Sequence, residues 1–142
     1  MNAASTIETY VVPERFEKAL KCIRGALGQM ELDVVEEFEI PERIESGPGR
    51  EIVTSRILLV SCPLLDFEAV ALGRASAVFF PLHVLVCAEG VRTRVSIVNP
   101  TSLFEARLPV GAGDPMDRLV ARVGMALDSL SQSDAESHGR AR

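Results

Sequence analysis

The chain has few cysteines, and they lie far apart. Its 142 residues include three, Cys22, Cys62 and Cys87. Their odd number and wide spacing exclude a disulfide framework and a CxxC metal or redox motif, so we expect reduced thiols. The sequence also lacks GxGxxG, a Walker loop, HExxH and GxSxG. The commonest signatures of dinucleotide, nucleotide, zinc-protease and hydrolase sites are therefore missing, and we expect no cofactor.

Long hydrophobic runs and an excess of positive charge are absent too. No apolar run approaches the roughly 20 residues that cross a bilayer. The opening residues, MNAASTIETY, contain neither a basic leader nor the apolar segment of a signal peptide. The formal net charge is −5, whereas a general nucleic-acid binder needs a clear cationic excess on one surface. We therefore expect a cytoplasmic protein that binds neither membranes nor nucleic acids.

Apolar residues are abundant and follow regular periods. They make up 47% of the chain, enough for one domain with a sizeable core. The last helical stripe of apolar residues ends at Leu130, and the remaining residues, SQSDAESHGRAR, have no apolar face. Residues 1–130 are therefore predicted to form a single α+β domain, and residues 131–142 a disordered tail.

The hydrophobic periods predict the order strand, helix, strand, strand, short helix, hairpin, helix. Strands are expected at residues 7–12, 32–40 and 52–61, long amphipathic helices at 14–27 and 114–130, and a short helix at 64–72. Gly28 and Gly73 are expected to end the first two helices, and Asp114 with Pro115 to begin the last. This order indicates an α+β fold with an antiparallel sheet of about five strands, two long helices and one short helix.

Residues 77–100 form the predicted hairpin, and its two faces differ. With Glu89 and Gly90 as the turn, Val86 pairs with Thr93 and Leu85 with Arg94. The face that carries Val86 is apolar and belongs in the core, because side chains alternate along a strand. The opposite face is mixed. Its candidate ligand-binding or interface residues are His83, Cys87, Arg92, Arg94 and Ser96.

The mixed face could bind a ligand or another subunit. Guanidinium groups offer paired donors to an anion, and His83 with Cys87 could ligate a soft metal. These two residues are four positions apart on a strand, roughly 13 Å, which is too far to share one metal ion. Phe79, Pro81 and Leu85 are apolar residues of the same face. We therefore predict a homodimer interface here, with contact to a small anionic ligand as the alternative.

Cys62 is the one candidate catalytic residue. It lies between a strand end and a helix amino terminus, where the helix macrodipole can favour a thiolate. No His or acidic residue is adjacent in sequence to complete a nucleophilic arrangement, so a buried packing role is the other interpretation.

Three acidic residues, Glu36, Glu37 and Glu39, lie close together in the strand predicted at residues 32–40. We interpret them as a solvated sheet edge and not as an acid–base pair. Glu36 also interrupts the alternation of this strand, which indicates a bulge or an edge position.

Five residues near the centre of the chain follow a recognisable pattern. They are Pro63 after a strand, Pro81 before the hairpin, Gly90 in its turn, and Asn99 with Pro100 after its last strand. With the hydrophobic pattern between them, residues 56–100 resemble the core of the domain-of-unknown-function 302 family. The resemblance implies a TATA-binding-protein-like α+β fold and a dimer, and it implies no activity and no catalytic residue.

Two functions are therefore considered. The first is a homodimeric module that binds a small ligand or a partner protein. The alternative is a thiol-dependent redox or sulfur-handling enzyme that uses Cys62.

Overall fold

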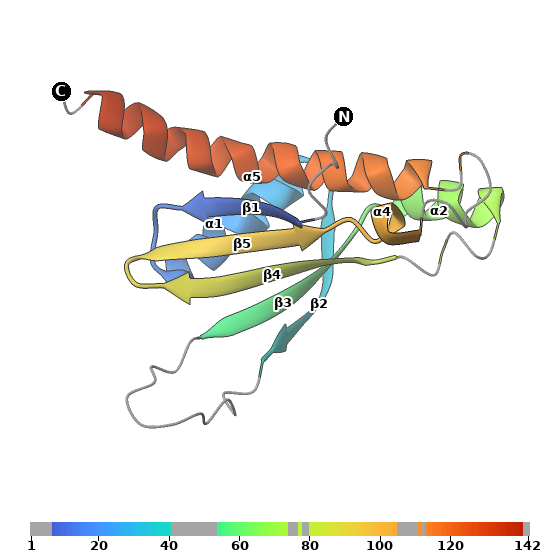
Figure 1. Cartoon of the computed structure of the whole chain (residues 1–142), viewed down its shortest axis with the longest axis horizontal. Helices are drawn as coiled ribbons and strands as arrows, with labels where there is room; N and C mark the ends of the chain where they lie inside the picture. Colours follow the sequence, from blue (N-terminus) through green and yellow to red (C-terminus); the bar gives the residue numbers. More distant parts are fainter. Residues whose placement is uncertain are drawn as a thin grey trace.

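The five strands of the computed structural model form one antiparallel sheet in the order β1-β5-β4-β3-β2 (Figure 1). The structure describes residues 7–40, 54–73, 77, 80–104, 111 and 113–140. Its elements are β1 (Ile7–Val12), α1 (Phe16–Gln29), β2 (Asp33–Glu39), β3 (Ser55–Ser61), α2 (Pro63–Leu72), β4 (Leu82–Glu89), β5 (Arg92–Val98), α4 (Thr101–Phe104) and α5 (Asp114–Arg140). The predicted α+β class and strand number are confirmed, and so is the element order except for the short helix α4, which was not predicted. The connection predicted at residues 41–51 lies outside the described residues.

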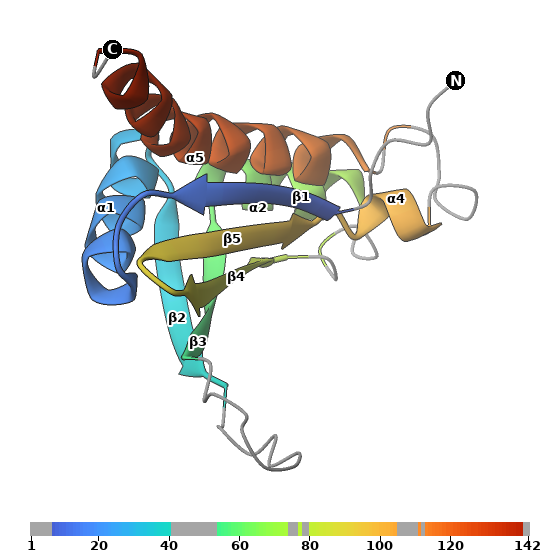
Figure 2. The ribbon, with the colours of Figure 1, turned by 60° about the vertical axis from the view of Figure 1, so that its left-hand side comes forward.

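Helices α1 and α5 cover one face of the sheet and pack on each other (Figure 2). Both helices bury an apolar stripe in the core. The stripe of α1 is Phe16, Leu20, Ile23 and Leu27, and that of α5 is Met116, Leu119, Val120, Val123 and Leu127. The apolar face of the hairpin packs beneath these helices. Its buried members are Leu82, Val84, Val86, Val95 and Ile97. Among the described helices, none has the length and apolar content needed to span a membrane.

The hairpin register differs by two residues from the predicted one. Val86 pairs with Val95 and Ala88 with Thr93, so the turn residues are Gly90 and Val91. Gly90 has a φ of 64°, and glycine at the first of two turn residues is typical of tight hairpins. A shift of two residues keeps each side chain on its own face. The predicted division into a core face and a mixed face is therefore correct although the pairing was wrong.

Strand β2 lies at a sheet edge and contains the predicted bulge. Its register with β3 shifts between Val34 and Glu36. The extra residue changes which side chains point to which face. Val34 packs against the core, whereas Phe38 pairs with Ile57 on the opposite face.

Both long helices extend beyond their predicted ends. Gly28 lies inside α1, and the left-handed residue that ends this helix is Glu31, with a φ of 60°. The backbone N–H of Leu32 donates to the carbonyl of Leu27 at 3.0 Å, the closing bond of a Schellman motif. Helix α5 continues to Arg140, beyond its predicted end at Leu130. Disorder of residues 131–142 stays a prediction.

A group of arginines and glutamates fastens β2 to the helix layer. Arg24 of α1 donates two hydrogen bonds to Glu37, both of 2.7 Å, and Arg56 of β3 approaches the same carboxylate at 3.3 Å. Arg56 also pairs with Glu39 at 3.0 Å. Arg24 holds the pKa of Glu37 below its ordinary value, chiefly through these hydrogen bonds. The predicted edge is therefore ion-paired at Glu37 and Glu39, whereas Glu36 is exposed.

The amide of Asn99 connects the end of β5 to the start of α5. Its Nδ2 donates to Oδ1 of Asp117 at 2.8 Å, and its Oδ1 accepts from the backbone N–H of Thr101 at 3.1 Å. The Thr101 hydroxyl lies 2.8 Å from the same Asp117 oxygen. Asn99, Thr101 and Asp117 thus hold the short helix α4 against both neighbours.

Helix α5 also crosses β1 very closely at Gly124. A Cβ atom at this position would lie 2.8 Å from the hydroxyl oxygen of Tyr10. This hydroxyl donates to Glu8 at 2.8 Å. Burial, and then this hydrogen bond, raises the pKa of Tyr10 above its ordinary value. The absence of a side chain at Gly124 therefore sets how near α5 lies to the sheet.

We expect the effect of Gly124→Ala to depend on the hydroxyl of Tyr10. Alanine is favoured over glycine in a helix interior by about 1 kcal/mol, but crowding in a packed site costs about 1–3 kcal/mol. In a Tyr10→Phe background the crowding is relieved, so the alanine should raise the free energy of unfolding by about 1 kcal/mol. Urea denaturation of the wild type, the two single variants and the double variant gives the coupling energy between Tyr10 and Gly124. Equal effects of Gly124→Ala in both backgrounds would contradict this close packing.

We expect Glu37 to contribute stability that is lost in acid. Its folded-state pKa is below the unfolded one, so the contribution is present above the unfolded value of about 4.3 and disappears as pH falls through the folded pKa. Glu37→Gln should lower stability at pH 7 by about 1 kcal/mol. It should also make stability fall less steeply below pH 4–5, roughly the range in which a glutamate of the unfolded chain titrates.

Denaturation at a series of pH values measures this difference. Glu36→Gln removes the same charge from an exposed position of the same strand and is the matched control. A pH profile that both variants change equally would show that Glu37 has no special role.

Candidate functional site

The sheet face opposite α1 and α5 carries the predicted mixed surface, and we call it the open face. The register of the five strands arranges its side chains in three rows. The rows are Val11, Arg94, Cys87 and Ser55; Thr9, Ser96, Leu85, Ile57 and Phe38; and Ile7, Val98, His83, Leu59 and Glu36. Glu89 and Arg92 follow at the turn of the hairpin. The structure thus places all five predicted surface residues on one face.

The polar residues of the open face do not converge on one point. Cys87 lies opposite Arg94, and its sulfur accepts a hydrogen bond of 3.3 Å from the Ser55 hydroxyl. His83 is exposed two residues before Leu85, and Ser96 is half-buried beside Leu85. The sequence prediction had placed Cys87 opposite Arg92 and Leu85 opposite Arg94, and these pairings were wrong because the turn lies one residue later. Within the described part of the chain, no three His, Cys, Asp or Glu side chains gather as metal ligands.

The guanidinium group of Arg94 forms an ion pair with the carboxylate of Glu89. Its Nε donates to Oε2 of Glu89 at 2.6 Å and its Nη2 to Oε1 at 3.1 Å. This pair lowers the pKa of Glu89 and raises that of Arg94, chiefly through these hydrogen bonds. Among the described residues, the open face therefore has two arginines, Arg92 and Arg94, and three acidic residues, Asp33, Glu36 and Glu89.

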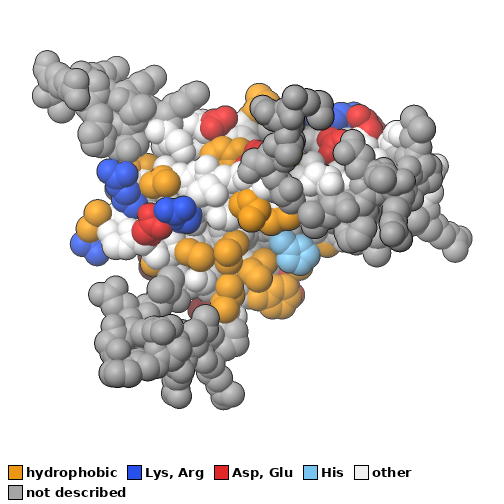
Figure 3. Space-filling view, viewed as in Figure 1, with side chains coloured by type: hydrophobic (Ala, Val, Ile, Leu, Met, Phe, Trp, Pro, Cys, Tyr) orange, Lys and Arg blue, Asp and Glu red, His pale blue; other side chains and the backbone are white. Residues whose placement is uncertain are grey.

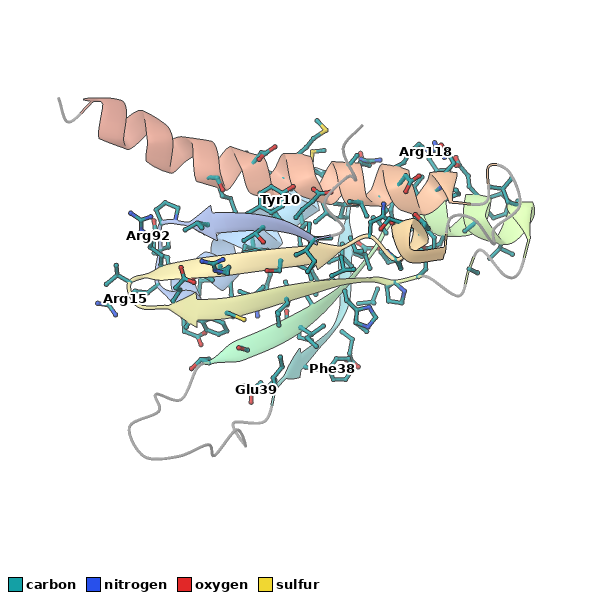
Figure 4. The ribbon with its side chains drawn as sticks, viewed as in Figure 1. Tyr10, Arg15, Phe38, Glu39, Arg92 and Arg118 are labelled. Carbon is teal, nitrogen blue, oxygen red and sulfur yellow. The ribbon has the colours of Figure 1, made fainter. Side chains whose placement is uncertain are left out.

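Apolar side chains occupy the middle of the open face. Ile57, Leu59 and Leu85 are half-buried neighbours on β3 and β4. Towards the sheet edges, Phe38 is 51% exposed and Ile7 is 54% exposed. Figure 3 shows this apolar surface beside a histidine, and Figure 4 shows Phe38 at the far edge on β2. An apolar centre with charged groups around it is the usual composition of a protein interface.

Cys62 lies at the N-cap of α2 with 3% of its surface exposed. It belongs to the hydrophobic core, and its side chain makes no capping hydrogen bond. Its carbonyl accepts a hydrogen bond of 2.9 Å from the backbone of Asp66. This burial is typical of a cysteine with a packing role, and the role of Cys62 stays a prediction.

The structure also contains a pocket that the sequence did not predict. One of its lining residues is Ser61, which directly precedes Cys62. The pocket has a volume of about 260 Å³ and is lined by Val35, Ser61, Asp66, Val70, Ala77, Phe80 and Pro81. The Ser61 hydroxyl donates to Oδ2 of Asp66, whereas Oδ1 of Asp66 is buried without a hydrogen-bond partner in the described structure. The available signal was a serine at a strand end followed by an aspartate in the first helical turn, which is too common to indicate a pocket.

Comparison with known proteins agrees with the fold. The family model described as "Domain of unknown function DUF302" matches residues 8–130. The crystal structure of an uncharacterized conserved DUF302 protein from Bacillus stearothermophilus superposes with a TM-score of 0.75 at 18% identity. The alignment covers 88% of this chain and 98% of that one. No curated protein sequence matches the chain. The resemblance inferred from Pro63, Pro81, Gly90, Asn99 and Pro100 is therefore confirmed, and the chain belongs to the DUF302 family.

Proposed function

We propose that the protein is a homodimeric module that binds a small ligand and whose subunits meet through the open face. The observation that carries the dimer is the apolar centre of that face, formed by Ile57, Leu59 and Leu85. Contiguous apolar surface is unfavourable in water and is typical of interaction sites. The two helices that pack extensively on the sheet both lie on its other face.

The charges of the open face favour a second copy of the chain as the partner. A twofold interface brings the same surface patch to both sides, so any net charge would meet its own sign. Among the described residues, two arginines face three acidic residues, Asp33, Glu36 and Glu89, so the net charge is small, and Arg94 is already paired with Glu89. An identical face can therefore approach with little net repulsion. The same pairing makes Arg94 a poorer contact for an anionic ligand, because two of its N–H groups already donate to Glu89.

We expect the wild-type protein to be a dimer and Leu85→Lys to weaken the dimer at least tenfold. The lysine would place a charge at the centre of the interface, where desolvation is costly. Met125→Lys is the matched control, because Met125 is 62% exposed on α5 and away from the open face. Sedimentation equilibrium over a range of concentrations measures both variants.

A folding defect in Leu85→Lys would confuse this result, so Phe38→Lys provides a second test. Phe38 is 51% exposed and should tolerate lysine in the isolated subunit. Circular dichroism shows whether each variant is folded. A wild-type chain that stays monomeric at every accessible concentration would overturn the proposed dimer.

The alternative, a thiol-dependent enzyme using Cys62, predicts a different chemical behaviour. Because Cys62 is buried and both Cys22 and Cys87 are partly exposed, we expect a thiol reagent to label the latter two first. Cys62 should react only after unfolding, which mass spectrometry of labelled peptides at pH 6 would show. Rapid labelling of Cys62 in the folded protein would instead favour the thiol-dependent function.

A further inference from the structure

We propose that the pocket beside α2 binds a small amine with a compact apolar body, and that Asp66 binds its ammonium group. This inference rests on the proposed ligand-binding function and names the ligand class and the site. Ser61 lies one row beyond Leu59 on the same sheet face, so the pocket borders the open face. The inference is nevertheless tested separately from the dimer. The evidence comes from the pocket lining, from one unpartnered oxygen and from the pocket volume.

The pocket wall is mostly apolar, with its polar groups joined to each other. Val35, Val70, Ala77, Phe80 and Pro81 form the apolar part. The polar part is Ser61, which is 7% exposed, together with Asp66. Ligand sites typically combine apolar walls with a few polar groups that orient the ligand. This composition suits a molecule with one polar end and one apolar end.

The polar end must be a hydrogen-bond donor. Oδ2 of Asp66 already accepts from Ser61, but Oδ1 is buried and has no partner among the described residues. A buried acceptor left without a donor is destabilising by roughly 1–3 kcal/mol. A ligand N–H group would remove this penalty, and a positively charged one forms the stronger bond with a carboxylate.

Among the described residues, the arginine that pairs with α2 is engaged outside the pocket. Arg118 of α5 forms ion pairs with Glu68 of α2 and with Asp114. Among the described residues, no Lys or Arg forms an ion pair with Asp66. The positive partner of Asp66 can therefore come from a ligand, whereas an anionic ligand would meet an unfavourable carboxylate.

The pocket volume limits the size of the apolar body. About 260 Å³ exceeds the roughly 150 Å³ of a cavity that holds benzene, and it is below the ~300–1,000 Å³ typical of drug-sized ligands. A single ring with a short amine arm fits this range. Val35 and Val70 are 55% and 57% exposed, so apolar surface also remains available on the outer part of the site.

Three probes of similar shape test the ligand class on the full chain. They are 2-phenylethylamine, 2-phenylethanol and phenylacetate, which carry a cation, a neutral donor and an anion. Amide chemical shifts are followed during each titration. We expect the amine to bind more tightly than the alcohol, phenylacetate to bind least, and the shifts to be largest around Ser61, Asp66 and Val70.

Two variants locate the interaction. Asp66→Asn should weaken binding of the amine roughly 10- to 100-fold, since a hydrogen bond to a charged group contributes about 1.5–3 kcal/mol. Glu68→Gln removes the same charge from the same helix outside the pocket lining and should leave the affinity unchanged. Ala77→Leu fills the pocket and should abolish binding of all three probes while the fold is retained.

The outcomes separate this inference from the proposed function. Binding of the alcohol but not the amine would overturn the amine assignment and leave ligand binding in place. Equal effects of Asp66→Asn and Glu68→Gln would overturn the role of Asp66. If none of the probes shifts the pocket residues, the pocket is not such a site, whereas the dimer is judged separately by Leu85→Lys.

Discussion

The structure depends on the burial of one face of β4 and β5 under α1 and α5. This contact supplies most of the core, because apolar side chains of the hairpin meet the apolar stripes of both helices. Both long helices lie on that side, so within the described part of the chain no long helix covers the other face of the sheet. The fold therefore produces an exposed surface with an apolar centre as a direct consequence of how its core is built. A second subunit is the simplest way to cover it.

The two proposed binding surfaces differ in physical character. The open face is broad, has a small net charge and presents apolar side chains from several strands, which suits a large and flat partner. The pocket is small and has one unpartnered acceptor, which suits a small molecule with a donor. Cys62 lies close to the pocket in sequence but packs into the core. The two surfaces adjoin at Ser61, which follows Leu59 on the same sheet face.

The sequence predicted most of the fold because hydrophobic periods survive small errors in pairing. The hairpin turn was displaced by one residue, yet the pairing moved by two, so every residue kept its face. Helix ends were less predictable. Gly28 looked like a stop, but the left-handed position is Glu31, where buried Leu32 closes the motif. The pocket could not be predicted, because β2, β3 and α2 approach Ala77, Phe80 and Pro81 only in the folded chain.

The contacts of Asn99 change how the pattern shared with the family is interpreted. Asn99 and Pro100 helped to identify the family, and a polar residue in such a position is easily mistaken for part of an active site. Here its amide meets Asp117 and Thr101, so it joins the last strand to the helix that follows. In this chain, Asn99 therefore has a structural role, which is to connect β5 to α5. The position of α5 over the sheet therefore depends on one exposed amide at the end of β5 as well as on the apolar stripe of the helix.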